Sequence, residues 1–193
     1  MDNLSVGRLI KELRTEKGLT QKNLADMLSV SDRAVSKWER GLGCPDISLL
    51  GELSKIFGVS TERLLLGALG KNPIDSGNVL KTKFYVCPTC GNILFSFGDA
   101  DMYCCGRILA PLTAKKADEA HAASFEDCDG DVYVALSHEM SRAHHIKFAV
   151  CFSFDRFILI RLYPEQDCSF TVPKQYSRSI FVYCTEHGFM KIK

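Results

Sequence analysis

The chain of 193 residues carries nine cysteines and five histidines, residue types that bind transition metals. Cys87 and Cys90 form a Cys-x-x-Cys segment, and the adjacent pair Cys104 and Cys105 follows it. A Cys-x-x-Cys turn presents two thiolates from one loop, and a second pair completes a tetrahedron around one metal ion. Four sulfur ligands select zinc or a single iron, and geometry alone does not choose between them. The spacing therefore predicts one four-cysteine metal site.

A second group of candidate ligands lies beyond residue 120, where all five histidines are found. Three segments carry it: residues 119–121 (EAH), 138–146 (HEMSRAHHI) and 183–188 (YCTEHG). These segments resemble the ligand segments of superoxide reductases. The segments that hold the paired cysteines, CPTCG at residues 87–91 and CCG at 104–106, resemble the small iron domain of desulforedoxin and desulfoferrodoxin.

The resemblance implies two mononuclear iron sites, the first held by the four paired cysteines. Zinc fits that first site as well, because a structural zinc ribbon uses the same ligands. The second iron would be ferrous with one open position, and its implied ligands are His121, His138, His144, Cys184 and His187. Neutral imidazoles stabilise the ferrous state, and an axial thiolate from Cys184 pushes electron density toward a molecule bound opposite. Superoxide could take one electron there and leave, after protonation, as peroxide.

Two positions beside the second ligand set bear on catalysis. Glu119 matches a family glutamate that closes over the oxidised iron, so it is our candidate catalytic residue. The family's lysine that attracts superoxide is Ala120 here, which lowers the expectation of fast catalysis, although Lys115 or Lys116 could partly substitute. We expect no metal at the remaining candidates, which are His145, Cys44, Cys128, Cys151 and Cys168.

Residues 4–66 are predicted to form short helices, because apolar residues recur at helical spacing and glycines such as Gly18, Gly41 and Gly58 end the repeats. Residues 20–41 (TQKNLADMLSVSDRAVSKWERG) resemble the Cro/C1-type, or XRE, helix-turn-helix family. Two short helices joined by a tight turn can place the second helix in the major groove of DNA. The alternative is a small helical bundle with an ordinary solvated polar face, which the joint pattern over this whole segment disfavours.

Polar residues of this segment are predicted to contact operator DNA. Arg33 and Lys37 on the second helix are the best candidates for guanine acceptors. The family resemblance implies that side chains near the start of that helix read the bases and that Gln21 contacts the phosphate backbone of DNA. The full predicted set is Gln21, Lys22, Asp32, Arg33, Ser36, Lys37 and Arg40. One such module binds weakly, so we expect a homodimer on two half-sites about 34 Å apart.

The sequence changes character after residue 66. Residues 67–83 contain Gly, Pro, Asn and Ser with little periodicity and are predicted to be a linker. Beyond them, β-branched and aromatic residues gather in short runs at 132–136, 146–154, 157–162, 170–172 and 180–184. The predicted fold class is multidomain α plus β. It comprises a five-helix lambda-repressor-like domain (1–66), the linker, a rubredoxin- or desulforedoxin-like metal ribbon (84–110) and an antiparallel immunoglobulin-like β-sandwich resembling superoxide reductase (111–193).

Net charge and the length of the apolar runs limit the class of protein but do not identify its partner. The net charge of +1 means that any DNA-binding charge is local to one face. The first twenty residues are charged throughout and the apolar runs are short, so we predict a cytoplasmic protein without membrane contact. The leading hypothesis is a transcriptional regulator that senses superoxide, another small oxidant or iron supply. The alternatives are an active superoxide reductase carrying a DNA-binding module, and a C-terminal domain whose metals only hold the fold.

Overall fold

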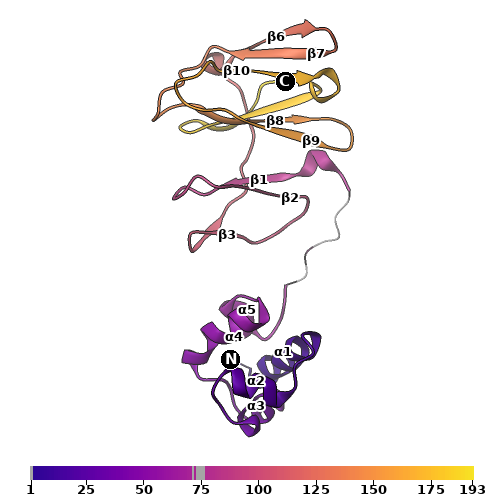
Figure 1. Ribbon diagram of the computed structural model, residues 1–193, viewed down its shortest axis with the longest axis vertical. Coiled ribbons are helices and arrows are strands. Elements are labelled where there is room, and N and C mark those ends of the chain that lie inside the picture. Colours follow the sequence, from indigo (N-terminus) through magenta and orange to yellow (C-terminus); the bar gives the residue numbers. More distant parts are fainter. Residues whose placement is uncertain (1, 71, 73–76) are drawn as a thin grey trace. The chain divides into compact units, whose positions relative to one another are not determined.

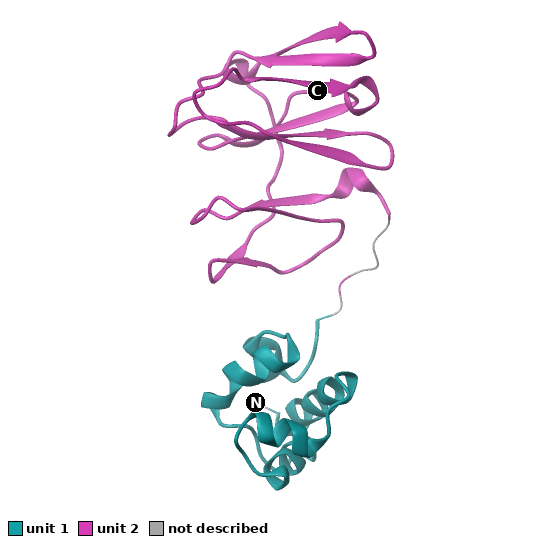
Figure 2. Cartoon of the chain, viewed as in Figure 1, with its two compact units in different colours: residues 1–71 teal, residues 72–193 magenta. Residues whose placement is uncertain are grey.

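The computed structural model describes residues 2–70, 72 and 77–193. The chain divides into two units, residues 1–71 and 72–193 (Figure 2). Within the described residues the first unit is helical, and the second consists of strands with short 3-10 turns (Figure 1). Residues 71 and 73–76, part of the predicted linker, lie outside the described residues. A helical domain followed by a β-rich unit confirms the predicted fold class.

The described part of the first unit contains five α-helices and one 3-10 turn. They are α1 (Asn3–Glu16), α2 (Gln21–Met27), α3 (Asp32–Glu39), η1 (Ile47–Leu49), α4 (Leu50–Phe57) and α5 (Thr61–Leu66). The side chains of Thr20 and Ser31 cap α2 and α3 by accepting hydrogen bonds from backbone N–H groups of the first turn. Asp46 caps η1 in the same way, and α4 continues from it at Leu50.

The helices share one apolar core, in which Ile10, Leu24 and Leu53 are fully buried. Close approach of α1 to the end of α3 depends on Gly7, because a Cβ there would lie 1.9 Å from the carbonyl oxygen of Trp38. Gly67 ends α5 in the left-handed region at φ +68, and a Cβ there would lie 2.6 Å from the backbone carbonyl carbon of Ser5. Both contacts are made by α1, which therefore packs closely against the ends of α3 and α5.

The second unit begins with two small antiparallel hairpins that form a ribbon at residues 83–109. The first hairpin pairs β1 (Lys83–Val86) with β2 (Ile93–Ser96), and the second pairs β3 (Met102–Cys104) with β4 (Arg107–Leu109). Between them lies a small buried core of Tyr85, Cys87 and Leu109. A ribbon of this size buries little apolar surface, so the hairpins need a further source of stability.

The rest of the unit is a sandwich of two sheets, with strand orders β10-β7-β6 and β5-β12-β11-β8-β9. The described neighbours are antiparallel except that β5 runs parallel to β12. The strands are β5 (Lys115–Lys116), β6 (Ala123–Cys128), β7 (Asp131–Leu136), β8 (Ile146–Phe152), β9 (Phe157–Arg161), β10 (Ser169–Pro173), β11 (Ser179–Cys184) and β12 (Gly188–Lys191). Two 3-10 turns, η3 (Glu119–His121) and η4 (Lys174–Tyr176), connect them, and η2 (Val79–Lys81) precedes the ribbon.

The five-stranded sheet is covered on both faces. Ala149 and Cys151 of β8 pack in the core between the two sheets, whereas Phe148 and Phe152 pack on the other face with Phe84 of β1. Because both faces of β8 are covered, its sequence is a continuous apolar run rather than an alternation of apolar and polar residues. The ribbon therefore rests on the sandwich, and the two form one unit.

The apolar runs in the sequence correspond to β7, β8, β9, β10 and β11. Within the sandwich, the sequence analysis missed β5, β6 and β12. Strand β5 has only two residues, both lysines, edge strand β6 exposes most of its polar side chains to solvent, and β12 is short and begins with Gly188. Strands β6 and β12 adjoin residues of the candidate site.

Candidate metal centres and DNA-binding surface

The four paired cysteines meet at one end of the ribbon. Cys87 and Cys90 lie in the loop after β1, Cys104 ends β3, and Cys105 occupies the following turn with a φ of 50°. The Sγ atoms all lie within 4.8 Å of one another, with Cys90 to Cys104 at 3.5 Å and Cys104 to Cys105 at 4.0 Å. A tetrahedral ion with metal–sulfur bonds of about 2.3 Å separates its sulfurs by about 3.8 Å. The spacing of these thiols thus fits one metal ion.

The electrostatics of this group also fit a cation. The backbone N–H of Cys90 lowers the pKa of Cys87 to about 6, whereas the Cys90 side chain raises the pKa of Cys105 to about 12. One thiol therefore ionises easily, whereas hydrogen bonding with the Cys90 side chain opposes ionisation of Cys104 and Cys105. A divalent cation removes this conflict, since it binds all four as thiolates.

The second group brings together ligands that are far apart in the chain. His121 ends η3, His138 follows β7, His144 precedes β8, Cys184 ends β11, and His187 lies in the turn before β12. Their ligand atoms all lie within 4.8 Å of one another. A register shift between Tyr183 and Cys184 interrupts the pairing of β11 with β8, and such irregularities re-aim side chains.

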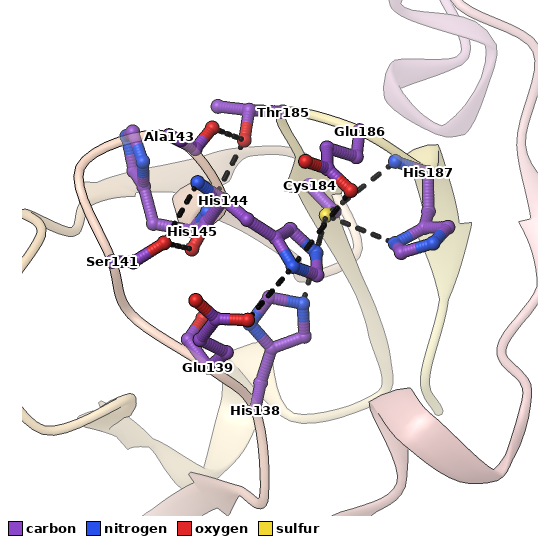
Figure 3. A network of polar contacts seen from close by, with 10 residues as sticks. All are labelled: His138, Glu139, Ser141, Ala143, His144, His145, Cys184, Thr185, Glu186 and His187. Atoms are coloured by element: carbon purple, nitrogen blue, oxygen red, sulfur yellow. Dashed lines mark hydrogen bonds and ion pairs between the residues drawn. The ribbon is translucent and has the colours of Figure 1, made fainter.

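The four imidazoles form a closed ring above the sulfur of Cys184. Neighbouring ring centroids are 4.7 Å apart for His121 and His138, 4.6 Å for His138 and His144, and 4.9 Å for both His144–His187 and His187–His121. The sulfur lies 3.1 Å from Nε2 of His144, 3.4 Å from Nδ1 of His187 and 3.6 Å from Nε2 of His138 (Figure 3). Four imidazoles and one thiol thus face one centre, a donor set that could hold a single transition-metal ion.

Contacts outside this ring determine which nitrogen of each imidazole faces inward. Nδ1 of His121 is bonded to the Asp118 carboxylate, and Nδ1 of His138 is bonded to the backbone oxygen of Glu139. Each contact leaves Nε2 as the free lone pair, the usual arrangement for a metal-binding histidine. Nε2 of His121 is buried and has no hydrogen-bond partner among the described residues. An orphaned buried nitrogen aimed at three imidazoles and a sulfur is what a missing metal ion would explain.

Hydrogen bonds hold together the two loops that carry these ligands. Thr185 Oγ1 donates to the backbone oxygen of Ala143 and accepts from the backbone N–H of His145, both at 3.1 Å (Figure 3). The backbone N–H of Thr185 donates to the backbone oxygen of His145, also at 3.1 Å. His144 and Cys184 are thereby fixed relative to each other by backbone contacts. Sequence analysis gave no role to Thr185, and only its place between two ligands marked it.

The other residues singled out from the sequence lie outside both ligand groups. Glu119 begins η3 and is exposed, and Ala120 is exposed beside it. His145 is half-buried and belongs to neither group. The four remaining cysteines also lie outside the two groups; they are Cys44, Cys128, Cys151 and Cys168. The structure thus brings together all nine predicted ligands and leaves Glu119 as an exposed neighbour.

The predicted DNA-binding residues gather on one face of the first unit. Six of them line a single surface hollow: Gln21, Asp32, Arg33, Ser36, Lys37 and Arg40. The seventh, Lys22, is exposed on α2. The apolar face of α3 is buried through Val35 and Trp38, so its polar face is turned outward.

Gln21 has an internal partner that the sequence analysis missed. Its Nε2 donates to the Glu39 carboxylate at 2.7 Å, and Arg14 donates to the same carboxylate at 2.5 and 3.2 Å. Glu39 is only 7% exposed, so this network ties α1, α2 and α3 together beneath the polar face. The Arg14–Glu39 pair lies 25 residues apart in sequence, and only the fold reveals it.

The two units are similar to different groups of known proteins. Residues 10–64 match the helix-turn-helix family model HTH_3. The chain is 48% identical over 58 residues to the HTH-type transcriptional activator BcrR of Enterococcus faecalis, covering 30% of this chain and 28% of that protein. It is 39% identical over 69 residues to the prophage-derived HTH-type transcriptional regulator YonR of Bacillus subtilis, covering 36% and 64%. The chain thus spans less than two thirds of the length of these relatives.

Among solved structures, the superoxide reductase of Treponema pallidum aligns with a TM-score of 0.51 at 17% identity, covering 58% of this chain and 98% of that one. The N-terminal unit is an XRE-type helix-turn-helix domain, and the β-rich unit has the superoxide reductase fold. At this identity the likeness shows the fold alone, so the chemistry depends on the residues described above. Among the described residues, no helix is long and apolar enough to cross a membrane.

Proposed function

We propose that this chain is a sequence-specific DNA-binding transcriptional regulator whose C-terminal unit binds iron, and that the state of this iron controls DNA binding. The observation that carries the proposal is the ring of four imidazoles over the buried Cys184 sulfur, in a chain whose other unit is a helix-turn-helix domain. The signal would be superoxide, another small oxidant or the supply of iron itself.

The donor set supports iron at the second site. Four neutral nitrogens and one thiolate suit a ferrous ion, which would supply one electron to an oxidant. The residues of the chain hold it in place: Asp118 orients His121, and the backbone N–H of His187 lies 3.5 Å from the Cys184 sulfur. Cys184 is 0% exposed, so its thiolate is shielded from solvent and requires a nearby cation.

We propose iron for the four-cysteine site as well, with zinc as the competing assignment. Metal analysis of the purified protein together with its absorption spectrum separates the two, because thiolate-to-ferric bands are absent from a zinc protein. Two irons per chain are expected. One iron and one zinc would leave the proposed regulator intact and make the ribbon a purely structural element.

The seven predicted contact residues are proposed to bind operator DNA, with Arg33 and Lys37 reading bases and Lys22 and Arg40 contacting phosphates. Because one module makes few phosphate contacts, we propose that a homodimer binds two half-sites. Selection from random duplexes yields the operator. On it, Lys37→Ala should weaken binding by about 1–3 kcal/mol and relax specificity at one position.

Coupling between metal and DNA is tested by measuring operator affinity for the ferrous, oxidised and metal-free protein. Useful coupling is typically about 1–3 kcal/mol, or roughly 5- to 150-fold in affinity. We expect a difference of this size between at least two of the three states. Equal affinity in all three would favour a C-terminal unit whose metals only hold the fold.

A pair of cysteine variants makes the test specific. Cys184→Ser removes the proposed axial ligand, whereas Cys128→Ser changes an exposed thiol on β6 that lies in neither ligand group. The Cys184 variant should bind operator with one affinity under all conditions, and the Cys128 variant should respond as the unaltered protein does. A response that persists without Cys184 would place the sensor elsewhere.

The second candidate function is superoxide reduction by a protein that also binds DNA. It is favoured by the donor set, because five ligand atoms leave one position of an octahedral site for superoxide. Stopped-flow decay of superoxide by the ferrous protein tests it, with Glu119→Gln probing the proposed catalytic role of that residue. A rate no faster than that of His138→Ala would exclude the enzyme. Ala120, in the position of the family's lysine, makes the regulator our first choice.

A further inference from the structure

Lys147 of β8 extends from the sandwich to the cysteine-bearing loop of the ribbon. A Cβ added to Gly91 would lie 2.2 Å from Nζ of Lys147 and 3.5 Å from its Cε. The ammonium group therefore lies against the backbone of Gly91, the residue directly after Cys90. A side chain at this position would require the end of Lys147 to move, and the φ of +69° independently favours glycine.

The charge of Lys147 has no partner in the described part of the chain. The residue is half-buried, and its ammonium group makes no ion pair or hydrogen bond with any described residue. The charged groups that act on it are Arg161 on β9, which repels it, and Cys90 in the ribbon loop, which attracts it. Burial and Arg161 lower the pKa of Lys147, so its charge is disfavoured by everything around it except the cysteine site.

We propose that Lys147 is the counter-charge of the four-cysteine centre, a positioning residue that favours the metal-loaded ribbon. Four thiolates and a divalent cation carry a net charge of minus two. This negative charge would pair with the ammonium group of Lys147. The cost of burying Lys147 is then offset only when the metal is bound. The inference rests on the four-cysteine metal site proposed above.

The same strand links this residue to the second centre. His144 lies two residues before β8, which begins at Ile146, and Lys147 is the second residue of that strand. A change in charge at the ribbon therefore acts on a strand whose preceding loop supplies a ligand to the imidazole ring.

The test compares Lys147→Met, which keeps the stem and removes the charge, with Lys147→Arg, which keeps the charge. Lys116→Met on β5 is the control, because this lysine is exposed and belongs to the same unit. Metal affinity of the full chain is measured by competition with a zinc chelator. Cobalt absorption identifies the four-sulfur site, since tetrahedral cobalt thiolates absorb far more strongly than five-coordinate cobalt. Stability is measured by urea unfolding of the metal-free, reduced protein.

We expect Lys147→Met to bind metal about tenfold more weakly at the four-sulfur site and to be more stable than the unaltered protein without metal. Lys147→Arg should restore affinity, and Lys116→Met should change neither quantity. A packing role for the lysine stem would instead lower metal-free stability in Lys147→Met, which would overturn the inference. Equal metal affinity of the Met variant and the unaltered protein would also overturn it. If the unaltered protein binds no cobalt with a four-sulfur spectrum, the site itself is wrong.

Discussion

The two candidate metal centres of the second unit are assembled in opposite ways. The cysteine centre takes all its ligands from two hairpin turns between residues 87 and 105, and Cys90 and Cys105 are exposed. The histidine centre draws on residues from 121 to 187; His121 and Cys184 are 0% exposed, His138 and His144 are half-buried, and His187 is exposed. Both sites combine buried and exposed ligands, but one is local whereas the other is distributed over the sandwich.

This difference implies a different role for a metal at each centre. The ribbon has a small core, so a metal bound there would supply a large part of its folding free energy. The histidine centre is built on a sandwich whose core already contains both sheets, so we expect that fold to form without an ion. A site that can lose or oxidise its metal without unfolding suits a signal, and a site that unfolds with its metal suits a structural role.

The largest effect should come from the axial ligand of the histidine centre. Cys184→Ser should reduce metal affinity there by more than about 100-fold, because a buried hydroxyl replaces a thiolate. Cys168→Ser is the matched control, since Cys168 is buried in the same core cluster but belongs to no ligand group. Metal titration and circular dichroism should show weak binding with a folded sandwich for the first variant only. Comparable metal loss in both variants would mean that core packing, rather than ligation, controls the site.

The next effect should be confined to the ribbon. Cys90→Ser removes an exposed ligand of the cysteine centre, and we expect hydrogen exchange to rise across residues 83–109 as the hairpins open locally. Metal affinity at the histidine centre should change less than threefold. Exchange that rises equally throughout the sandwich would show that the two centres are one cooperative unit, and the contrast between them would fail.

The same contrast explains how much of the molecule the sequence predicted. The Cys-x-x-Cys turn and the helix-turn-helix segment are local patterns, so spacing alone located Cys87, Cys90 and α3. The histidine ligands were located through family resemblance, because no spacing rule joins His121 to His187 across the fold. Asp118, Thr185 and Lys147 were missed because each acts through a contact that exists only in three dimensions. The Arg14–Glu39 pair was missed for the same reason.

A smaller effect should come from the residue that orients His121. Asp118→Asn weakens the bond to Nδ1 and should lower metal affinity at the histidine centre by about tenfold. The bond to His121 lowers the pKa of Asp118, so the carboxylate is charged and stabilises the histidine that it holds. Glu126→Gln on β6 is the control, because Glu126 is exposed and outside the ligand group. Isothermal titration with the two variants distinguishes orientation of His121 from a general loss of negative charge in this unit.

The smallest effect should come from the exposed carboxylates beside His144. Its Nδ1 lies 3.4 Å from the Glu139 carboxylate and 3.9 Å from that of Glu186, and these carboxylates are 62% and 56% exposed. Exposed ion pairs contribute little, so Glu139→Gln should lower metal affinity by about two- to threefold at low salt. The effect should shrink at high salt, because screening acts on exposed charges. The double variant with Glu186→Gln should lose more than either single variant if the two carboxylates share His144. A tenfold loss from Glu139→Gln alone would show that Glu139 contributes as much to metal binding as Asp118 does.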